Sequence, residues 1–183
     1  MTALDTIELL LNEQKGRPPL DKWHPELSGD IDIRIAADGR WFHEGDEIKR
    51  HELARLFSSI LRREQDGEYY LVTPVEKWRL VVDDLPLLVI DSEVEGEGSS
   101  HQRIAVKTNM DRWYVIDADH PLSVTEDANS GEPQPSVMTE YGLAARINRA
   151  SFYRLVELAR EEGGRLLLRS AGKDFDLGSV HAD

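Results

Sequence analysis

The segment from Thr73 to Lys77 places a hydroxyl, a carboxylate and an amine within five residues, between two apolar stretches. A lysine amine can bind an anion through a charge-assisted hydrogen bond, and a threonine hydroxyl can add a neutral one. The same five residues also suit a well-capped hairpin turn, because Pro74 fits the second position of a tight turn. The segment is therefore a candidate binding site and a candidate structural turn, and the sequence leaves both open.

Two arginines occupy the same place in a repeated pattern. Residues 48–57 and 147–156 both read Ile-x-Arg-x-x-apolar-x-Arg-Leu-apolar, which puts Arg50 and Arg149 in equivalent positions. A cation in the first turn of a helix opposes the helix dipole, so a packing contact or a bound anion must compensate. Because both copies carry the arginine, a shared packing role is the simpler interpretation, such as stacking on an aromatic ring or pairing with a carboxylate.

Known catalytic and metal-binding patterns do not occur. His51-Glu52 is followed by Arg55 where a zinc protease needs a second histidine. Gly96-Glu97-Gly98 lacks a third glycine and is flanked by acidic residues that would repel phosphate, so it does not match a dinucleotide fingerprint. The six histidines fall at no chelating spacing, and the chain has no cysteine. We therefore expect no metal site, and any cofactor stays unknown.

The charge balance limits the partners. The chain has 22 basic and 35 acidic residues and a formal net charge of −13, which argues against binding a nucleic-acid backbone. No apolar run reaches the roughly 18 residues of a membrane helix, and the N-terminus lacks a signal peptide's positive region. We expect a cytoplasmic protein with no membrane insertion. A protein partner is possible at the acidic segment 91–97.

The repeated pattern also predicts the elements that would carry these residues. Helices are expected over about 48–64 and 143–161, with Phe57 and Val156 in equivalent inward positions. Apolar alternation and turn signals predict strands over residues 30–36, 41–43, 68–73, 77–82, 87–94, 103–108, 113–116, 165–168 and 173–177, with a loop over 126–135.

Together these elements predict an α+β fold of two tandem β-hairpin–helix–β-hairpin repeats. The strands should be mostly antiparallel, because consecutive strands are joined by turns too short for a parallel crossover. The expected division is an N-terminal helix and linker over residues 1–22, a first repeat over 23–84 and a second over 85–183.

An ordered series of short motifs resembles a known family. The motifs lie at residues 29–33, 38–45, 48–53 and 66–77, then at Thr108-Asn109 and at residues 120–122. In this order, over nearly all of the chain after about residue 20, they resemble the bacterial family catalogued as domain of unknown function 1285. The resemblance implies a duplicated α+β core whose second half is pleckstrin-homology-like. It also suggests a role in signal transduction and a ligand site between the halves for a nucleotide-like molecule.

The resemblance selects the candidate site residues. We expect a ligand-binding or signal-transduction module whose polar motif residues face one another across a cleft between the repeats and bind a small anionic ligand. These residues are His43, Arg50, Thr73, Glu76, Lys77, Thr108, Asn109 and His120. The alternatives are an enzyme with His43 or His120 as general base, oriented by Glu76, and a protein-interaction domain with an acidic surface.

Overall fold

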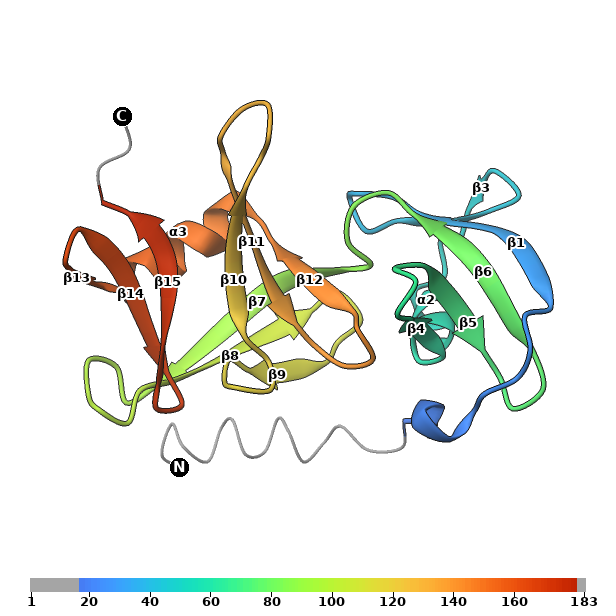
Figure 1. The fold of residues 1–183 in the computed structure, drawn as a ribbon, viewed down its shortest axis with the longest axis horizontal. Helices are drawn as coiled ribbons and strands as arrows, with labels where there is room; N and C mark the ends of the chain where they lie inside the picture. The colour runs from blue at the N-terminus through green and yellow to red at the C-terminus, as the bar shows by residue number, and fades with distance from the viewer. Residues whose placement is uncertain (1–16, 181–183) are drawn as a thin grey trace. The chain divides into compact units, whose positions relative to one another are not determined.

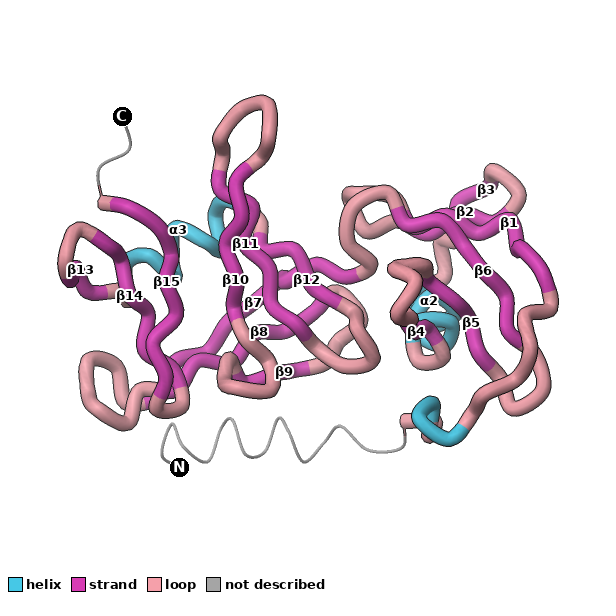
Figure 2. Tube along the Cα trace, in the orientation of Figure 1, coloured by secondary structure: helices cyan, strands magenta, loops and turns pink. Residues whose placement is uncertain are grey.

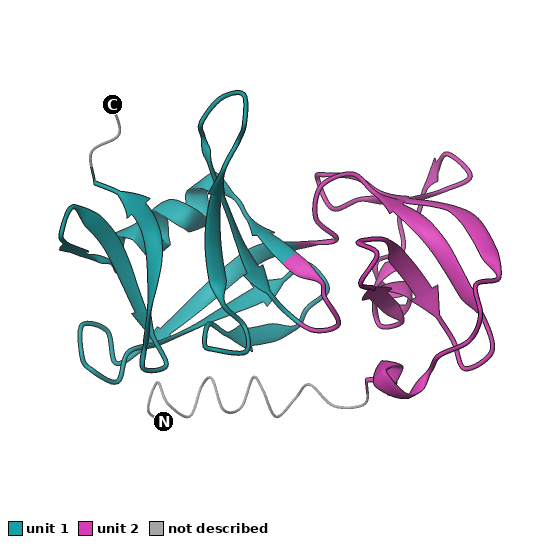
Figure 3. Cartoon of the chain, viewed as in Figure 1, with its two compact units in different colours: residues 1–14, 88–139, 145–183 teal, residues 15–87, 140–144 magenta. Residues whose placement is uncertain are grey.

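The computed structural model describes residues 17–180, which form two compact units (Figure 3). The N-terminal unit comprises residues 17–87 and 140–144, and the C-terminal unit comprises residues 88–139 and 145–180. The helix expected near the N-terminus lies outside the described residues. The short segment 140–144 joins the N-terminal unit because Tyr141 accepts a hydrogen bond from the Arg63 amide (2.9 Å) and Glu140 pairs with Arg17.

The N-terminal unit is built on one six-stranded sheet with the order β3-β2-β1-β6-β5-β4 (Figure 1). Its elements are η1 (Leu20–Lys22), β1 (Gly29–Ile35), β2 (Trp41–His43), β3 (Asp46–Glu47), α2 (His51–Ser58), β4 (Leu61–Arg63), β5 (Tyr69–Val72) and β6 (Lys77–Val82). Strands β1 and β6 pair in parallel at the centre, and the other paired strands are antiparallel.

Each face of this sheet carries its own apolar cluster. On one face, the alternating Ile33 and Ile35 of β1 are buried, and Trp41 stacks on Phe57 of α2 at a ring separation of 6.3 Å. On the other, Tyr70 and Val72 of β5 form a buried cluster with Leu20, against which Trp23, Ile60 and Tyr141 pack. Strand β5 is consequently buried at all four positions.

The C-terminal unit contains two sheets. The larger has the order β10-β11-β12-β7-β8-β9, and the smaller has the order β13-β14-β15. Its elements are β7 (Leu87–Glu95), β8 (Arg103–Thr108), β9 (Trp113–Val115), β10 (Leu122–Glu126), β11 (Pro133–Met138), β12 (Ala144–Ile147), α3 (Arg149–Glu157), β13 (Arg160–Glu162), β14 (Arg165–Ser170) and β15 (Lys173–Ser179). Helix α3 follows β12 and leads directly into the small sheet (Figure 1).

A buried hydroxyl joins the two sheets of the C-terminal unit. Ser170, at the end of β14, is fully buried. Its Oγ accepts a hydrogen bond from the Ile104 amide (3.0 Å) and donates one to the Ile116 carbonyl (2.6 Å). Beside it, the buried Gln102 side chain donates to the Arg169 carbonyl (2.8 Å). The small sheet is thus held to β8 and to the end of β9 by polar groups that have no access to water.

Both predicted helices are too long. Helix α2 ends at Ser58, and Leu61 belongs to β4, opposite Leu71 of β5. Residues 144–147 and 160–161, placed in the second helix by the pattern, belong to β12 and β13. The predicted loop over residues 126–135 is also too long, because β11 begins at Pro133. In each case the pairing of strands outweighs a local helical or loop preference.

The predicted α+β class is confirmed in its coarser form. The described chain is mostly strand (Figure 2). Each unit contains one α-helix and one six-stranded sheet. Three antiparallel strands follow each helix, but β4–β6 belong to the six-stranded sheet of their unit whereas β13–β15 form a separate sheet. The helix-and-hairpin repeat stays a prediction. No helix among residues 17–180 is long and apolar enough to cross a membrane.

The equivalent leucines of the two helices have opposite surroundings. Leu155 of α3 is 1% exposed, whereas Leu56 of α2 is 62% exposed. We therefore predict that Leu155→Ala lowers the free energy of unfolding by about 2–5 kcal/mol, the usual cost of truncating a buried leucine. Leu56→Ala should change it by less than about 0.5 kcal/mol. Urea unfolding measures both, and equal losses would contradict the assigned helix faces.

The Ser170 junction gives a second prediction. Ser170→Ala should lower the free energy of unfolding by about 1–3 kcal/mol, because the Ile104 amide and the Ile116 carbonyl each lose a buried partner. Ser123→Ala, at an exposed position of β10, is the matched control and should have almost no effect. If urea melts show the two variants to be equally stable, the hydroxyl is not an important tie between the sheets.

Candidate functional site

The Thr73–Lys77 turn is held by its own polar groups. The Thr73 amide donates to the Glu76 carbonyl (2.9 Å), and Thr73 Oγ1 accepts from the Glu76 amide (3.0 Å). Glu76 accepts a longer hydrogen bond from the Trp78 indole (3.4 Å). The threonine hydroxyl therefore has a structural role in the turn, while Val75 at its tip is 81% exposed.

Lys77 belongs to a charged network on the face of the N-terminal sheet that carries Tyr70 and Val72. Its Nζ lies 2.9 Å from Glu64 and 4.6 Å from the centre of the Tyr70 ring. The other Glu64 oxygen accepts from Arg62 (2.6 Å), and Arg62 also donates to the carbonyls of Leu20 and Trp23. This network ties the N-terminal segment to β4 and β6.

Hydrogen bonding shifts the pKa values in this network. Partial burial favours the neutral form of Glu64, but the hydrogen bonds from Lys77 and Arg62 outweigh it and hold the pKa of Glu64 below its usual value. The Tyr70 hydroxyl donates to Asp66 at 2.5 Å, which raises the pKa of Tyr70 to about 12. The same bond, with one from the Glu68 amide, lowers the pKa of Asp66.

The remaining predicted residues of the N-terminal unit are exposed. His43 ends β2, with its Nε2 3.9 Å from the Glu44 carboxylate. Arg50 precedes the first residue of α2, and its side chain makes no capping hydrogen bond. The Glu76 carboxylate contacts Trp78, and no contact joins it to His43 in the described chain. The geometry therefore does not form the general-base pair of His43 and Glu76.

The predicted residues of the C-terminal unit stabilise turns. Thr108 Oγ1 accepts from the Met110 amide (3.3 Å), and Asn109 exchanges hydrogen bonds with the backbone of Leu88. His120 Nδ1 lies 2.9 Å from the Thr139 carbonyl, and its ring packs edge-on against Tyr114. Thr108 and Asn109 lie together at the end of β8, and His120 lies before β10.

The structure brings only some of the predicted residues together. Thr73, Glu76 and Lys77 share one turn, and Thr108 and Asn109 share another. The two groups lie in different units, and the expected cleft between the repeats stays a prediction. Among residues 17–180, no three acidic or histidine side chains gather closely enough to hold a metal ion.

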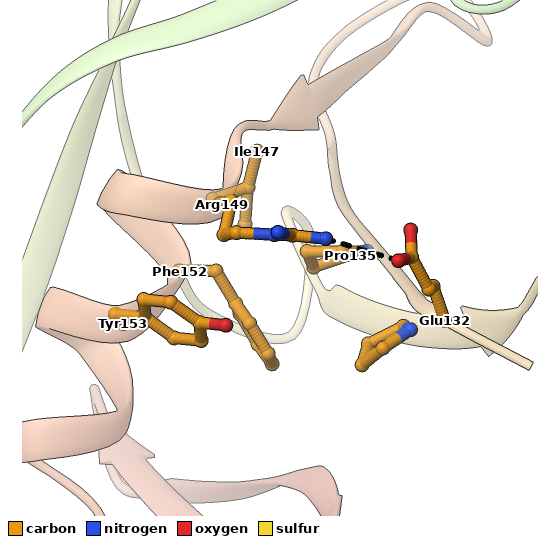
Figure 4. Close-up of a pocket in the computed structure, with 7 residues that line it drawn as sticks. Glu132, Pro135, Ile147, Arg149, Phe152 and Tyr153 are labelled. Carbon is orange, nitrogen blue, oxygen red and sulfur yellow. Dashed lines mark hydrogen bonds and ion pairs between the residues drawn. The ribbon is translucent and has the colours of Figure 1, made fainter.

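A pocket that the sequence did not reveal lies between β11 and α3 of the C-terminal unit. It encloses about 380 Å³ and is lined by Glu132, Pro133, Pro135, Ile147, Arg149, Phe152 and Tyr153. Pro135, Ile147 and Phe152 are buried and form an apolar floor. Figure 4 shows Arg149 reaching from the start of α3 toward Glu132, beyond the end of β12.

One ion pair forms the polar part of this pocket. The Arg149 guanidinium lies 3.1 Å from the Glu132 carboxylate, and these two side chains are 68% and 62% exposed. The equivalence of Arg149 to Arg50 was the one sequence signal for this site. The lining residues come from β11, β12 and α3, and the prolines of β11 favoured a loop, so the sequence did not predict that they meet.

Two family models together match residues 18–177. The family model described as "Domain of unknown function (DUF1285), N-terminal domain" matches residues 18–85, and that described as "Protein of unknown function (DUF1285), C-terminal domain" matches residues 86–177. A DUF1285 family protein from Silicibacter pomeroyi DSS-3 is 42% identical, with a TM-score of 0.85, over 97% of this chain and 95% of that one.

A second solved structure is more distant. A DUF1285 family protein from Shewanella baltica OS155 is 30% identical, with a TM-score of 0.55, over 70% of this chain and 92% of that one. A search of the curated proteins found no match.

The Glu64 network predicts a pH dependence. Because the folded-state pKa of Glu64 is below the usual 4.5, its stabilising contribution is present above that value and is lost as the pH falls through the lowered pKa. Between pH 7 and pH 3, the wild type should therefore lose more stability than Glu64→Gln. Urea melts at several pH values measure this, with Glu26→Gln, at an exposed position, as control. Parallel pH profiles for the wild type and Glu64→Gln would show that the network does not stabilise the fold.

Proposed function

This chain belongs to the DUF1285 family, and we propose that it is a non-catalytic module that binds a small ligand with an anionic group through Arg149. The observation that carries the proposal is the placement of this arginine beside the apolar floor of a pocket of about 380 Å³. Small-molecule sites in proteins are typically concave and mostly apolar, with a few polar groups that fix the orientation of the ligand.

A ligand anion can replace Glu132 as the partner of Arg149. Exposed ion pairs contribute only about 0–1 kcal/mol, because water screens the charges and two long side chains lose freedom. An incoming carboxylate or phosphate can replace Glu132 at little cost and form two parallel hydrogen bonds with the planar guanidinium. Lys77 is less suited to this role, because its side chain is only 17% exposed and its amine already pairs with Glu64.

The floor of the pocket would bind the apolar part of the ligand. Pro135, Ile147 and Phe152 offer an apolar surface beside the arginine. A planar ring or a branched aliphatic group would lose its contact with water there, at roughly 25 cal/mol for each Å² of apolar surface buried. A nucleotide-like ligand, which the family resemblance suggested, combines a ring with an anionic group and belongs to this class.

A role in signal transduction is the natural extension of this proposal. A module that binds a ligand without transforming it can report the concentration of that ligand to a partner, provided that two states differ in affinity for it. The pleckstrin-homology-like character of the second half stays a prediction, and the proposal does not depend on it. Nor does it need the general bases or the acidic surface of the two alternative functions.

The proposal predicts binding that depends on both the anion and Arg149. Adenosine monophosphate and 3-phenylpropionate are suitable probes, with adenosine and 3-phenylpropanamide as their uncharged counterparts. At least one charged probe should raise the melting temperature, because a ligand that binds only the folded state stabilises it. Arg149→Ala should weaken that binding by roughly ten- to hundredfold, the effect of losing one charge-assisted interaction.

Arg154→Ala is the matched control, because Arg154 lies on the same helix but does not line the pocket. It should leave the affinity for the charged probe unchanged in calorimetric titration. The proposal fails if no ligand with an anionic group raises the melting temperature, or if Arg149→Ala and Arg154→Ala bind the charged ligand equally well.

A further inference from the structure

The two walls of the α3–β11 pocket carry opposite hydrogen-bonding character, and from this we infer that its ligand is an α-amino acid with an apolar side chain. This inference rests on the proposed function and specifies the ligand class. The ligand would place its carboxylate on Arg149, its ammonium on the Glu132 side, and its side chain on the floor formed by Pro135, Ile147 and Phe152.

The β11 wall of the pocket has no hydrogen-bond donor among its lining residues, which are Glu132, Pro133 and Pro135. The Glu132 carboxylate can only accept hydrogen bonds when it is ionised. The two prolines have no backbone N–H to donate. This wall therefore suits a cation.

The α3 wall offers donors. The Arg149 guanidinium can only donate, and it lies at the first residue of the helix. The Tyr153 hydroxyl also lines the pocket, on a side chain that is 58% exposed, and it can donate to a second carboxylate oxygen. An anionic group is therefore expected on this wall and a cationic group on the other.

The spacing of the two charges selects an α-amino acid among zwitterions. Arg149 and Glu132 approach to 3.1 Å, so the two charges that replace them must also lie close together. An α-amino acid carries its ammonium and carboxylate on the same carbon, whereas a dipeptide separates them by the length of a peptide unit. A ligand with only an anionic group can displace Glu132 from Arg149, whereas an α-amino acid also gives Glu132 an ammonium group as its new partner and should therefore bind more tightly.

The test uses the full chain and isothermal titration calorimetry. L-phenylalanine and L-leucine are the probes. Three analogues remove one feature at a time: 3-phenylpropionate lacks the ammonium, phenethylamine lacks the carboxylate, and glycyl-phenylalanine separates the two charges. The variants are Glu132→Gln and Arg149→Gln. Their controls are Glu126→Gln, at an exposed position of β10, and Arg154→Gln. Urea midpoints establish that each variant is folded.

At least one of the two amino acids is expected to bind. If phenylalanine binds, each of the three analogues should bind roughly ten- to hundredfold more weakly than phenylalanine. Glu132→Gln should remove the preference for phenylalanine over 3-phenylpropionate, and Arg149→Gln should remove the preference over phenethylamine. Both control variants should bind as the wild type does.

Different failures separate the inference from the proposed function. If 3-phenylpropionate binds at least as tightly as phenylalanine and its binding depends on Arg149, the ligand is a simple anion, so the inference is wrong and the proposed function stands. Equal affinity for glycyl-phenylalanine overturns the α-amino acid assignment, as does the absence of binding by both amino acids. If no charged probe shows binding that depends on Arg149, the proposed function fails as well.

Discussion

The C-terminal unit depends on one buried hydroxyl group. Ser170 satisfies the Ile104 amide and the Ile116 carbonyl at a place that water cannot reach, and so fixes the small sheet against the large one. Helix α3 lies between the strands of these two sheets in the chain, and its Phe152 and Leu155 are buried. Arg149 begins this helix, and the pocket is lined by residues of the helix and of the large sheet.

The N-terminal unit uses charge pairing where the C-terminal unit uses a buried hydroxyl. Glu64 bridges Arg62 and Lys77, and Arg62 extends the network to the backbone carbonyls of Leu20 and Trp23. These charges are partly shielded, so their pairing is less screened than that of the exposed Arg149–Glu132 pair. The contrast distinguishes a structural lysine from an arginine whose partner can be exchanged. The sequence presented Lys77 as a candidate anion-binding residue, whereas for Arg149 it favoured a packing role.

The repeated pattern shows how similar sequences acquire different roles. Leu56 and Leu155 are equivalent in the pattern, yet the first is exposed and the second is buried. Arg50 and Arg149 are also equivalent in the pattern. Of the two, Arg149 lines the pocket that α3 forms with the proline-containing strand β11. Three strands follow each helix, and in one unit they complete the six-stranded sheet while in the other they form a sheet of their own. The differences between the copies lie in what the helices pack against.

The sequence by itself determined the α+β class and most of the strands, because alternation and turn residues are local properties. The predicted strands 41–43, 77–82 and 103–108 coincide with β2, β6 and β8. It also indicated Arg149 through the repeat, but with a packing role as the simpler interpretation. Only the tertiary structure decided that Leu61 belongs to a strand, that Pro133 and Pro135 lie in β11, and that Glu132 pairs with Arg149. The physical reason is that a local pattern fixes the period of a segment, whereas burial, strand pairing and the approach of opposite charges depend on residues distant in the chain.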